Sequence, residues 1–160
     1  MPEAAPKLQK AMERAVTTTL ENMAFMEARA LHEDHDCLGA SPIYCANLLV
    51  LDPIQGELVM LMPEELLKQI AGNIYALPEE ELSDRMLADL MSELLNTIAG
   101  IFLSALLPSD QTFGMGLPTI SRDECHELEP PVERWHFQVD GKPFCFSAGG
   151  SAWQRFEDKH

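Results

Sequence analysis

Four residues on one predicted helix have the types and the spacing to act together on a bound partner. Asp89, Glu93, Asn96 and Gly100 follow one another at intervals of three or four positions. At 100° per residue they fall within roughly 60° of arc on one side of a helix, and we call them the polar stripe. A carboxylate can anchor a cation, and an amide can orient a water molecule because it both donates and accepts hydrogen bonds.

The helix that must position the polar stripe is predicted over Ser83–Leu107, and its other side is apolar. That side carries Leu87, Leu90, Met91, Leu94, Leu95, Ile98, Ile101, Phe102, Ala105 and Leu106. Such a pattern is typical of a helix that buries one side in a core. Gly100 costs about 1 kcal/mol relative to alanine in an exposed helix, but it leaves room for another backbone. On spacing alone, a surface helix with one poor residue is the simpler interpretation.

The residues around the stripe change that balance, because they resemble the CheC/CheX family of chemotaxis phosphatases. The family shows an acidic residue or serine, then ExxN on a helix, then a later proline. Here these are Asp89, Glu93, Asn96 and Pro118. The resemblance covers Gly56–Ile120, from GELVMLMPEELLKQIAG to FGMGLPTI, and the rest of the chain is similar to the family in layout only.

The resemblance implies an α+β fold, a pseudo-twofold duplication in which an antiparallel or mixed β-sheet packs with long helices on one side. It also implies a protein phosphatase that hydrolyses the aspartyl phosphate of a CheY-like response regulator in chemotaxis. Asn96 would orient the attacking water and Glu93 would anchor a lysine of the receiver, so both are predicted catalytic residues. Asp89, Gly100 and Pro118 are predicted to lie at the partner contact. The chain is expected to bind no cofactor or metal, with Mg²⁺ on the receiver.

A comparison of the two halves of the chain predicts one working site. Setting Asn22 against Asn96 aligns Thr19 with Glu93 and Met26 with Gly100. Thr19 lacks the carboxylate, and Met26 fills the place of the glycine. The single site is similar to that of CheX, rather than of a two-site CheC, and this likeness implies a homodimer.

The alternative is a non-catalytic adaptor that binds a receiver without turnover, since the same fold occurs in flagellar switch proteins. An adaptor has no chemical need for the Glu93 and Asn96 pair. Its presence therefore favours the enzyme.

Length and charge limit the remaining possibilities. The 160 residues fit a single domain over 1–160, with residues 1–6 and the last few frayed, and the hydrophobic content of 46% supports a core. The net charge of −15 argues against nucleic acid and against an anionic membrane surface. It favours a partner that presents lysine or arginine.

Targeting and thiol signals predict a cytoplasmic protein. The first residues contain no apolar segment of a signal peptide, and no apolar run reaches the length of a membrane span. Four cysteines stand singly, so reduced thiols are expected: Cys37, Cys45, Cys125 and Cys145. The cluster His32–Cys37 is interpreted as a solvated loop rather than a metal site.

Apolar periodicity and turn residues predict the remaining elements. We expect Ser83 to be the N-cap of the central helix and Asp140-Gly141 to form a hairpin turn. The other expected elements are a helix over Lys7–Leu31 with a possible short strand in Ala28–Glu33, a strand over Ile43–Leu51 and its return from Gly56, a helix over Pro63–Tyr75, an edge strand over Gln111–Ile120, strands over Glu133–Val139 and Lys142–Ala148, and a short helix around Trp153 and Phe156.

Overall fold

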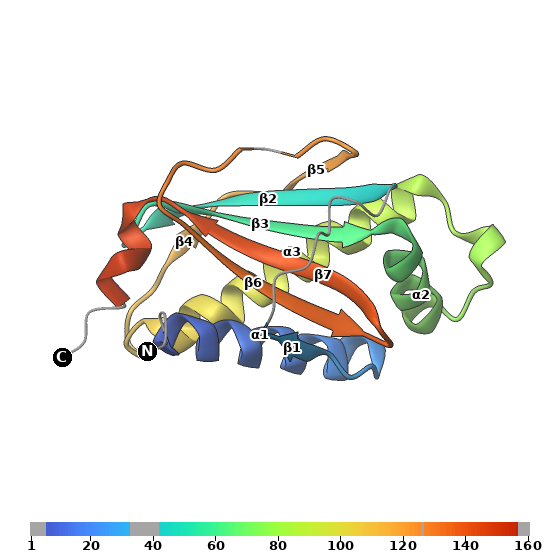
Figure 1. The fold of residues 1–160 in the computed structure, drawn as a ribbon, viewed down its shortest axis with the longest axis horizontal. Helices are drawn as coiled ribbons and strands as arrows, with labels where there is room; N and C mark the ends of the chain where they lie inside the picture. The colour runs from blue at the N-terminus through green and yellow to red at the C-terminus, as the bar shows by residue number, and fades with distance from the viewer. Residues whose placement is uncertain (1–5, 33–41, 126, 157–160) are drawn as a thin grey trace.

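The computed structural model describes residues 6–32, 42–125 and 127–156 of the chain. One helix, a run of strands, two further helices and a second run of strands follow one another, as in an α+β fold (Figure 1). The elements are α1 (Pro6–Ala24), β1 (Arg29–Leu31), β2 (Ile43–Asp52), β3 (Gly56–Pro63), α2 (Glu64–Tyr75), the 3₁₀ turn η2 (Glu79–Glu81), α3 (Asp84–Leu106), β4 (Gly114–Met115), β5 (Thr119–Arg122), β6 (Val132–Val139), β7 (Lys142–Gly149) and the 3₁₀ turn η3 (Ser151–Phe156).

The sheet shows the expected pseudo-twofold duplication in its strand order. The order is β1-β6-β7-β3-β2-β4, β5 also pairs with β2, and every described pairing is antiparallel. The order through β5 is β1-β6-β7-β3-β2-β5. When β1 is exchanged with β5, β2 with β6 and β3 with β7, it becomes β5-β2-β3-β7-β6-β1, which is the same order in reverse. The two halves meet at the central β3–β7 pair, where Val59 lies opposite Ser147. Each half therefore supplies one hairpin and places its short strand against the hairpin of the other half.

The long helices α1 and α3 pack on one face of this sheet, as predicted. In Figure 1, α3 passes behind the strands and α1 lies beside it along the lower edge. Alternate residues of the strands face the helices and are buried with them, including Leu48, Met60, Phe137 and Phe146. By length and composition α3 is apolar enough to cross a membrane. In this fold its apolar side instead forms the core of the domain.

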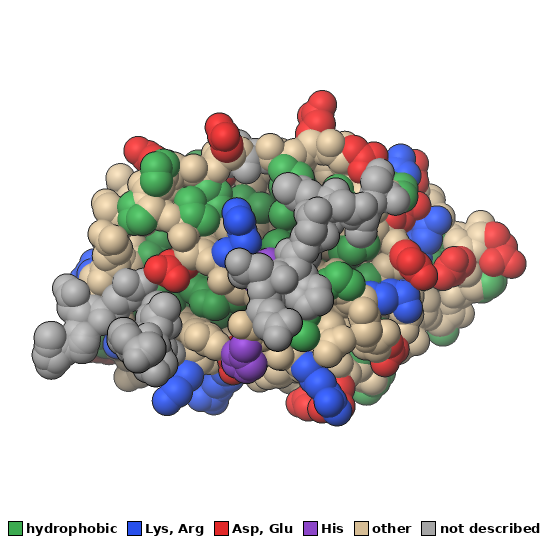
Figure 2. All heavy atoms as spheres, viewed as in Figure 1, with side chains coloured by type: hydrophobic (Ala, Val, Ile, Leu, Met, Phe, Trp, Pro, Cys, Tyr) green, Lys and Arg blue, Asp and Glu red, His purple; other side chains and the backbone are tan. Residues whose placement is uncertain are grey.

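The opposite face of the sheet is only partly apolar. Figure 2 shows hydrophobic side chains on that face, with charged groups among and around them. A second, smaller buried cluster lies there, formed by Ile43, Cys45, Val59, Leu61 and Cys145. Because strand side chains alternate between the two faces, this cluster is separate from the main core.

The first helix ends earlier than the sequence predicted. α1 ends at Ala24 rather than Leu31, because Phe25 adopts a left-handed backbone with φ of 57°. The chain then forms β1 at Arg29–Leu31, inside the predicted short strand. Helical periodicity continued past Ala24, but pairing of β1 with β6 determines this segment's conformation. The helix also begins at Pro6, inside the segment expected to be frayed.

The predicted edge strand Gln111–Ile120 is two short strands instead of one. β4 and β5 both pair with β2, and the chain between them leaves the ladder at Gly116–Pro118. The Gly116 amide still donates to the Leu49 carbonyl at 2.7 Å. Pro118 has no amide hydrogen, so the ladder cannot continue through it.

Two other local predictions are confirmed and one is wrong. The Ser83 side chain accepts a hydrogen bond from the Met86 amide at 3.1 Å and caps α3. Asp140 and Gly141 both have positive φ angles, as a two-residue hairpin turn requires. Pro63 is the N-cap of α2 rather than its first helical residue. The ends predicted to be frayed, at 1–5 and 157–160, lie outside the described residues.

Candidate functional site

The polar stripe lies on the outer side of α3. Asp89, Glu93 and Asn96 are exposed and Gly100 is half-buried. The neighbouring positions on the same helix are buried: Leu87, Leu90, Met91, Leu94, Leu95, Ile98, Ala99, Phe102, Leu103 and Leu106. The fold thus brings the four predicted residues onto one solvent-facing strip.

Packing along the length of α3 fixes the direction in which the stripe points. Near the C-terminal end of the helix, the Phe102 ring meets Trp135 of β6 with centroids 6.0 Å apart and Trp153 of η3 at 5.6 Å. At the other end Ser83 caps the first turn. Rotation of the helix would remove Phe102 from its aromatic neighbours, so the direction of the stripe is determined by the core.

Gly100 has no role in the packing of the described part of the chain. A β-carbon built at Gly100 would have no heavy atom within 4 Å, apart from its own helix and chain neighbours. By contrast, a β-carbon at Gly56 would lie 2.6 Å from Nε1 of Trp153, and one at Gly149 would lie 2.8 Å from Cβ of Leu128. Those two glycines are required by the fold, whereas Gly100 leaves an open notch in an exposed helix surface.

Tyr75, the last residue of α2, is a further side chain beside the stripe. Burial raises the pKa of its hydroxyl, and the nearby charges of Glu93 and Asp89 raise the pKa further. Tyr75 remains partly exposed, so a partner on the stripe would reach it. The sequence analysis missed Tyr75, because its distance of 18 positions from Glu93 carries no periodic signal. Only the packing of α2 against α3 brings the two together.

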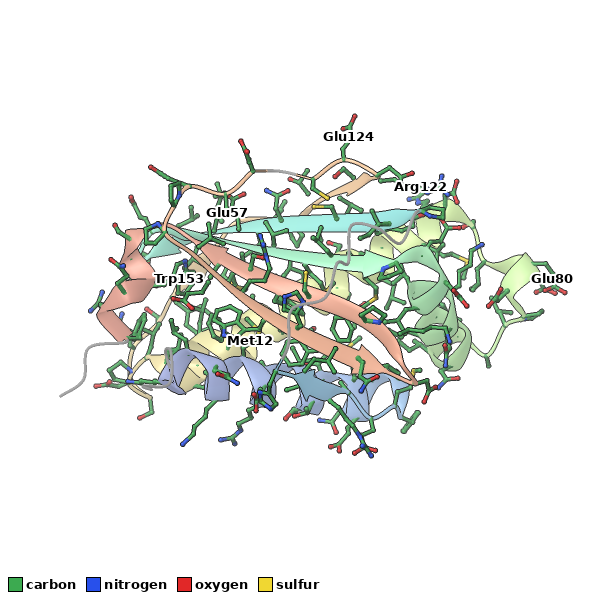
Figure 3. All side chains as sticks on the ribbon, in the orientation of Figure 1. Met12, Glu57, Glu80, Arg122, Glu124 and Trp153 are labelled. Atoms are coloured by element: carbon green, nitrogen blue, oxygen red, sulfur yellow. The ribbon has the colours of Figure 1, made fainter. Side chains whose placement is uncertain are left out.

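The surroundings of the stripe are acidic. The connection between α2 and α3 contains Glu79, Glu80 and Glu81, and α3 begins with Asp84. Figure 3 shows Glu80 at the outermost point of this connection, directed away from the molecule. Together with Asp89 and Glu93, these side chains give this end of the molecule a negative potential that favours a basic partner surface.

Pro118 lies apart from the polar side chains, in the segment between β4 and β5. It is half-buried and directly precedes β5, which contacts α3. Its neighbour Leu117 is 90% exposed. Pro118 thus shapes the sheet edge next to the helix and brings no reactive group to the site.

The corresponding positions in the first half of the chain do not form an exposed stripe. Thr19, aligned with Glu93, is 1% exposed, and Met26, aligned with Gly100, is buried. Asn22, the counterpart of Asn96, is exposed, whereas the other two aligned positions are buried. The helix that occupies the equivalent place in the first half therefore presents a different surface.

Within the described ranges, no group of three or more histidine, cysteine or acidic side chains is arranged to hold a metal ion. His32 is exposed, and 33–37 of the discounted cluster lie outside those ranges. Cys45, Cys125 and Cys145 are free thiols, and Cys37 also lies outside. His136 of β6 is buried.

Comparison with known proteins agrees with this architecture. The sequence model of the family described as chemotaxis phosphatase CheX matches residues 44–141, which include the whole polar stripe and Pro118. No curated protein matches the sequence.

Solved structures show the same fold at low sequence identity. The chemotaxis protein CheX from Vibrio vulnificus is 16% identical with a TM-score of 0.70, over 92% of this chain and 99% of that one. CheX of Borrelia burgdorferi, in a complex with CheY, BeF₃ and Mg²⁺, is 17% identical with a TM-score of 0.63, over 88% and 95%. FliY from Thermotoga maritima is 14% identical with a TM-score of 0.62, over 94% of each chain.

Proposed function

The chain belongs to the CheX family of chemotaxis phosphatases, and from this premise we propose that it hydrolyses the aspartyl phosphate of a CheY-like receiver protein. The observation that carries the proposal is the exposed stripe of Glu93 and Asn96 beside the open notch at Gly100. The helix buries its apolar side in the core and keeps these side chains in solvent, where a partner can reach them. The complex of CheX with CheY from Borrelia burgdorferi supports a receiver as that partner.

In the proposed reaction Asn96 positions the attacking water. An acyl phosphate needs no nucleophile from the protein, so the main requirement is a water held in line with the departing carboxylate. The Asn96 amide can accept one hydrogen bond from this water and donate another, and it brings no charge that would repel phosphate. Each tenfold change in rate corresponds to about 1.4 kcal/mol of activation free energy. We expect one well-placed amide to contribute a factor of about a hundred in rate.

Glu93 serves as the anchor in this proposal. Its carboxylate would be repelled by the phosphoryl group, but it can pair with a lysine that lines the phosphorylation site of the receiver. Gly100 gives the receiver backbone room to approach α3, and Asp89 contacts the rim. The Mg²⁺ that neutralises the phosphoryl oxygens is bound by the receiver, and this chain supplies no metal ligand.

The test is the lifetime of a phosphorylated CheY-type receiver from the same cell, measured with wild-type protein and with Asn96→Ala. We expect the wild type to shorten the lifetime and Asn96→Ala to lose about a hundredfold of this effect while still binding. Ser104→Ala is the matched control, because Ser104 is exposed on α3 one turn beyond Gly100. An unchanged receiver lifetime with the wild type, at concentrations where it binds, would exclude the phosphatase.

A receiver-binding adaptor without turnover is the second candidate. An adaptor would need the exposed stripe only as a docking surface and would need no chemistry from Asn96. An adaptor predicts that binding depends on Glu93 and Gly100 but that Asn96→Ala changes nothing. The two candidates therefore differ in whether Asn96→Ala changes the lifetime of the phosphorylated receiver.

We further propose that the protein is a cytoplasmic homodimer. The β4–β5 segment lies at the outer edge of the sheet beyond β2, and unpaired strand edges are surfaces on which a second chain can associate. The net charge of −15 argues against nucleic acid or anionic membranes as additional partners.

A further inference from the structure

An apolar groove lies on the sheet face opposite α3, at the end where β2 leads into β3. Leu49 and Leu51 of β2 are 51% and 48% exposed, although leucine is usually buried. Both side chains line a cavity of about 350 Å³, which we call the leucine groove. Figure 2 shows hydrophobic side chains at this end of the face, with acidic groups around them. Exposed apolar side chains beside a cavity mark a surface that a partner can cover.

Strand register determines what the groove contains. Leu48 and Val50 belong to the main core, so Leu49 between them faces away from the helices. Leu49 lies opposite Glu57 of β3, and Glu57 lies opposite Gly149 of β7. An exposed apolar side chain, a carboxylate and a position without a side chain therefore follow one another across three strands.

Backbone contacts fix one wall of the groove. A β-carbon on Gly149 would lie 2.8 Å from Cβ of Leu128, so the segment before β6 crosses the sheet directly against this glycine. The Gly150 amide donates to the carbonyls of Glu129 and Pro131 at 2.8 and 3.2 Å. Glu129 is thereby held beside the groove, which it lines. The groove is thus formed before a partner binds, which lowers the ordering cost of binding.

The charge of the groove is negative. Glu57 and Glu129 line it, and no lysine, arginine or histidine of the described residues does. The Asn47 amide donates to the Glu57 carboxylate at 3.0 Å and orients it. A second copy that used the same groove would place these carboxylates against their own equivalents, which opposes self-association here. A positively charged partner is favoured instead, and the net charge of −15 acts in the same direction.

We propose that the leucine groove docks a segment of another protein in which large apolar side chains are followed by lysine or arginine. The apolar side chains cover Leu49 and Leu51, and the cations pair with Glu57 and Glu129. Pockets that bury small ligands begin at about 300 Å³, so the groove fits one or two large side chains. Because α3 lies on the other face of the sheet, the groove and the polar stripe can be occupied at the same time.

The experiment uses two acetylated and amidated tetrapeptides as probes, LFKK and its acidic counterpart LFEE. Both are titrated into the wild-type chain while NMR follows the methyl resonances of Leu49 and Leu51. We expect LFKK to shift these resonances and to bind at least tenfold more tightly than LFEE. The difference should shrink in about 1 M salt, where charges are screened within about 3 Å.

Charge and apolar variants locate the binding site. Glu129→Lys and Leu49→Ser should each weaken LFKK binding about tenfold, which corresponds to about 1.4 kcal/mol. Glu124→Lys is the matched control, because Glu124 is exposed in the same connection between β5 and β6 but does not line the groove. Figure 3 shows Glu124 projecting from the upper edge, apart from Glu57. The control should bind LFKK as the wild type does.

Four results would each overturn the proposal. These are equal affinity for the two peptides, unshifted Leu49 and Leu51 methyl resonances at millimolar LFKK, equal losses in Glu124→Lys and Glu129→Lys, and methyl shifts that follow protein concentration without peptide. The last result would identify a second copy as the occupant. None of these readouts involves a receiver, and Asn96→Ala should bind LFKK normally, so this inference stands or falls separately from the phosphatase.

Discussion

At the scale of single residues, the proposed site depends on Gly100, which has no side chain. Gly100 interrupts an exposed helix surface where alanine would be favoured by about 1 kcal/mol, and no packing within the described chain requires it. A residue that weakens its own helix without improving the fold is best explained by an external contact. The adjacent Asn96 and Glu93 give that contact its proposed chemistry.

Gly100→Ala should therefore separate stability from function. We expect the free energy of unfolding to rise by about 1 kcal/mol in urea denaturation, because the helix gains propensity and the new methyl group has open space. Dephosphorylation of the receiver should fall by about tenfold or more, since the methyl group overpacks the interface.

The matched control is Gly72→Ala, a half-buried glycine of α2 outside the stripe. Its new β-carbon would lie 3.4 Å from the Leu77 carbonyl oxygen, and receiver dephosphorylation should be unchanged. Equal loss of activity in both variants would show that Gly100 has no specific place in the contact.

At the scale of elements, α1 and α3 occupy equivalent places but face their environment differently. On α3 the position of Glu93 is exposed, and on α1 the aligned Thr19 is buried without a hydrogen-bond partner for its hydroxyl. A buried, unpaired hydroxyl costs free energy that a methyl group would not. The side of α1 that carries Thr19 therefore packs in the core.

Thr19→Val should stabilise the protein by about 1 kcal/mol, because valine has nearly the same shape and no unpaired polar atom. Thr17→Val is the control, since the Thr17 hydroxyl donates to the Glu13 carbonyl at 2.9 Å and lies nearer the surface. Thermal or urea unfolding of both variants measures the difference. A larger gain from Thr17 would contradict the account of Thr19.

An ion cluster joins α2 to the sheet edge and predicts a pH effect. Glu64 pairs with Arg122 of β5 at 2.6 Å and with Lys68 at 3.1 Å. Burial acts to raise the pKa of Glu64, but hydrogen bonds from Lys68 and Arg122 outweigh it and lower the pKa below the usual 4.5. Because the folded pKa is the lower one, the stabilisation is present above about pH 4.5 and is lost as pH falls through the folded value.

Glu64→Gln should accordingly destabilise the protein at pH 7 and have a smaller effect at pH 3. Urea unfolding of wild type and variant at the two pH values gives this difference directly. Glu65→Gln is the control, because Glu65 is exposed in the same first turn of α2. A Glu64→Gln deficit that is equal at both pH values would indicate lost packing instead of lost ion pairing.

At the scale of the whole molecule, the open edge of the sheet offers a surface on which a second chain can bind. Leu117 protrudes from the β4–β5 edge, and the Gly116 amide beside it is tied to Leu49. A fixed and exposed leucine at a strand edge is a suitable anchor for a second copy of the chain.

Sedimentation at micromolar concentration should detect a dimer in the wild type and a monomer in Leu117→Asp. The fold should persist, because Leu117 is 90% exposed and makes no core contact. Phe25→Asp is the control, as Phe25 is 83% exposed at the end of α1 with a positive φ that aspartate tolerates. A monomeric wild type would contradict the dimer.

Much of the fold followed from local sequence signals. The 3.6-residue apolar period and the Ser83 cap defined α3, and Asp140-Gly141 defined the second hairpin, because helix periodicity and turn conformation are properties of neighbouring residues. The same period placed Asp89, Glu93, Asn96 and Gly100 on one face. The family resemblance, rather than any single spacing, gave these residues a chemical meaning.

The tertiary structure decided what depends on contacts between distant residues. α1 ends at Ala24 despite continuing periodicity, because Phe25 is left-handed and the chain beyond it pairs with β6 as β1, and Pro118 divided the predicted edge strand. Tyr75 lies close enough to Glu93 to feel its charge only because α2 packs against α3 in this fold. A sequence pattern describes one element at a time, whereas a site on two elements exists only once the core has oriented both.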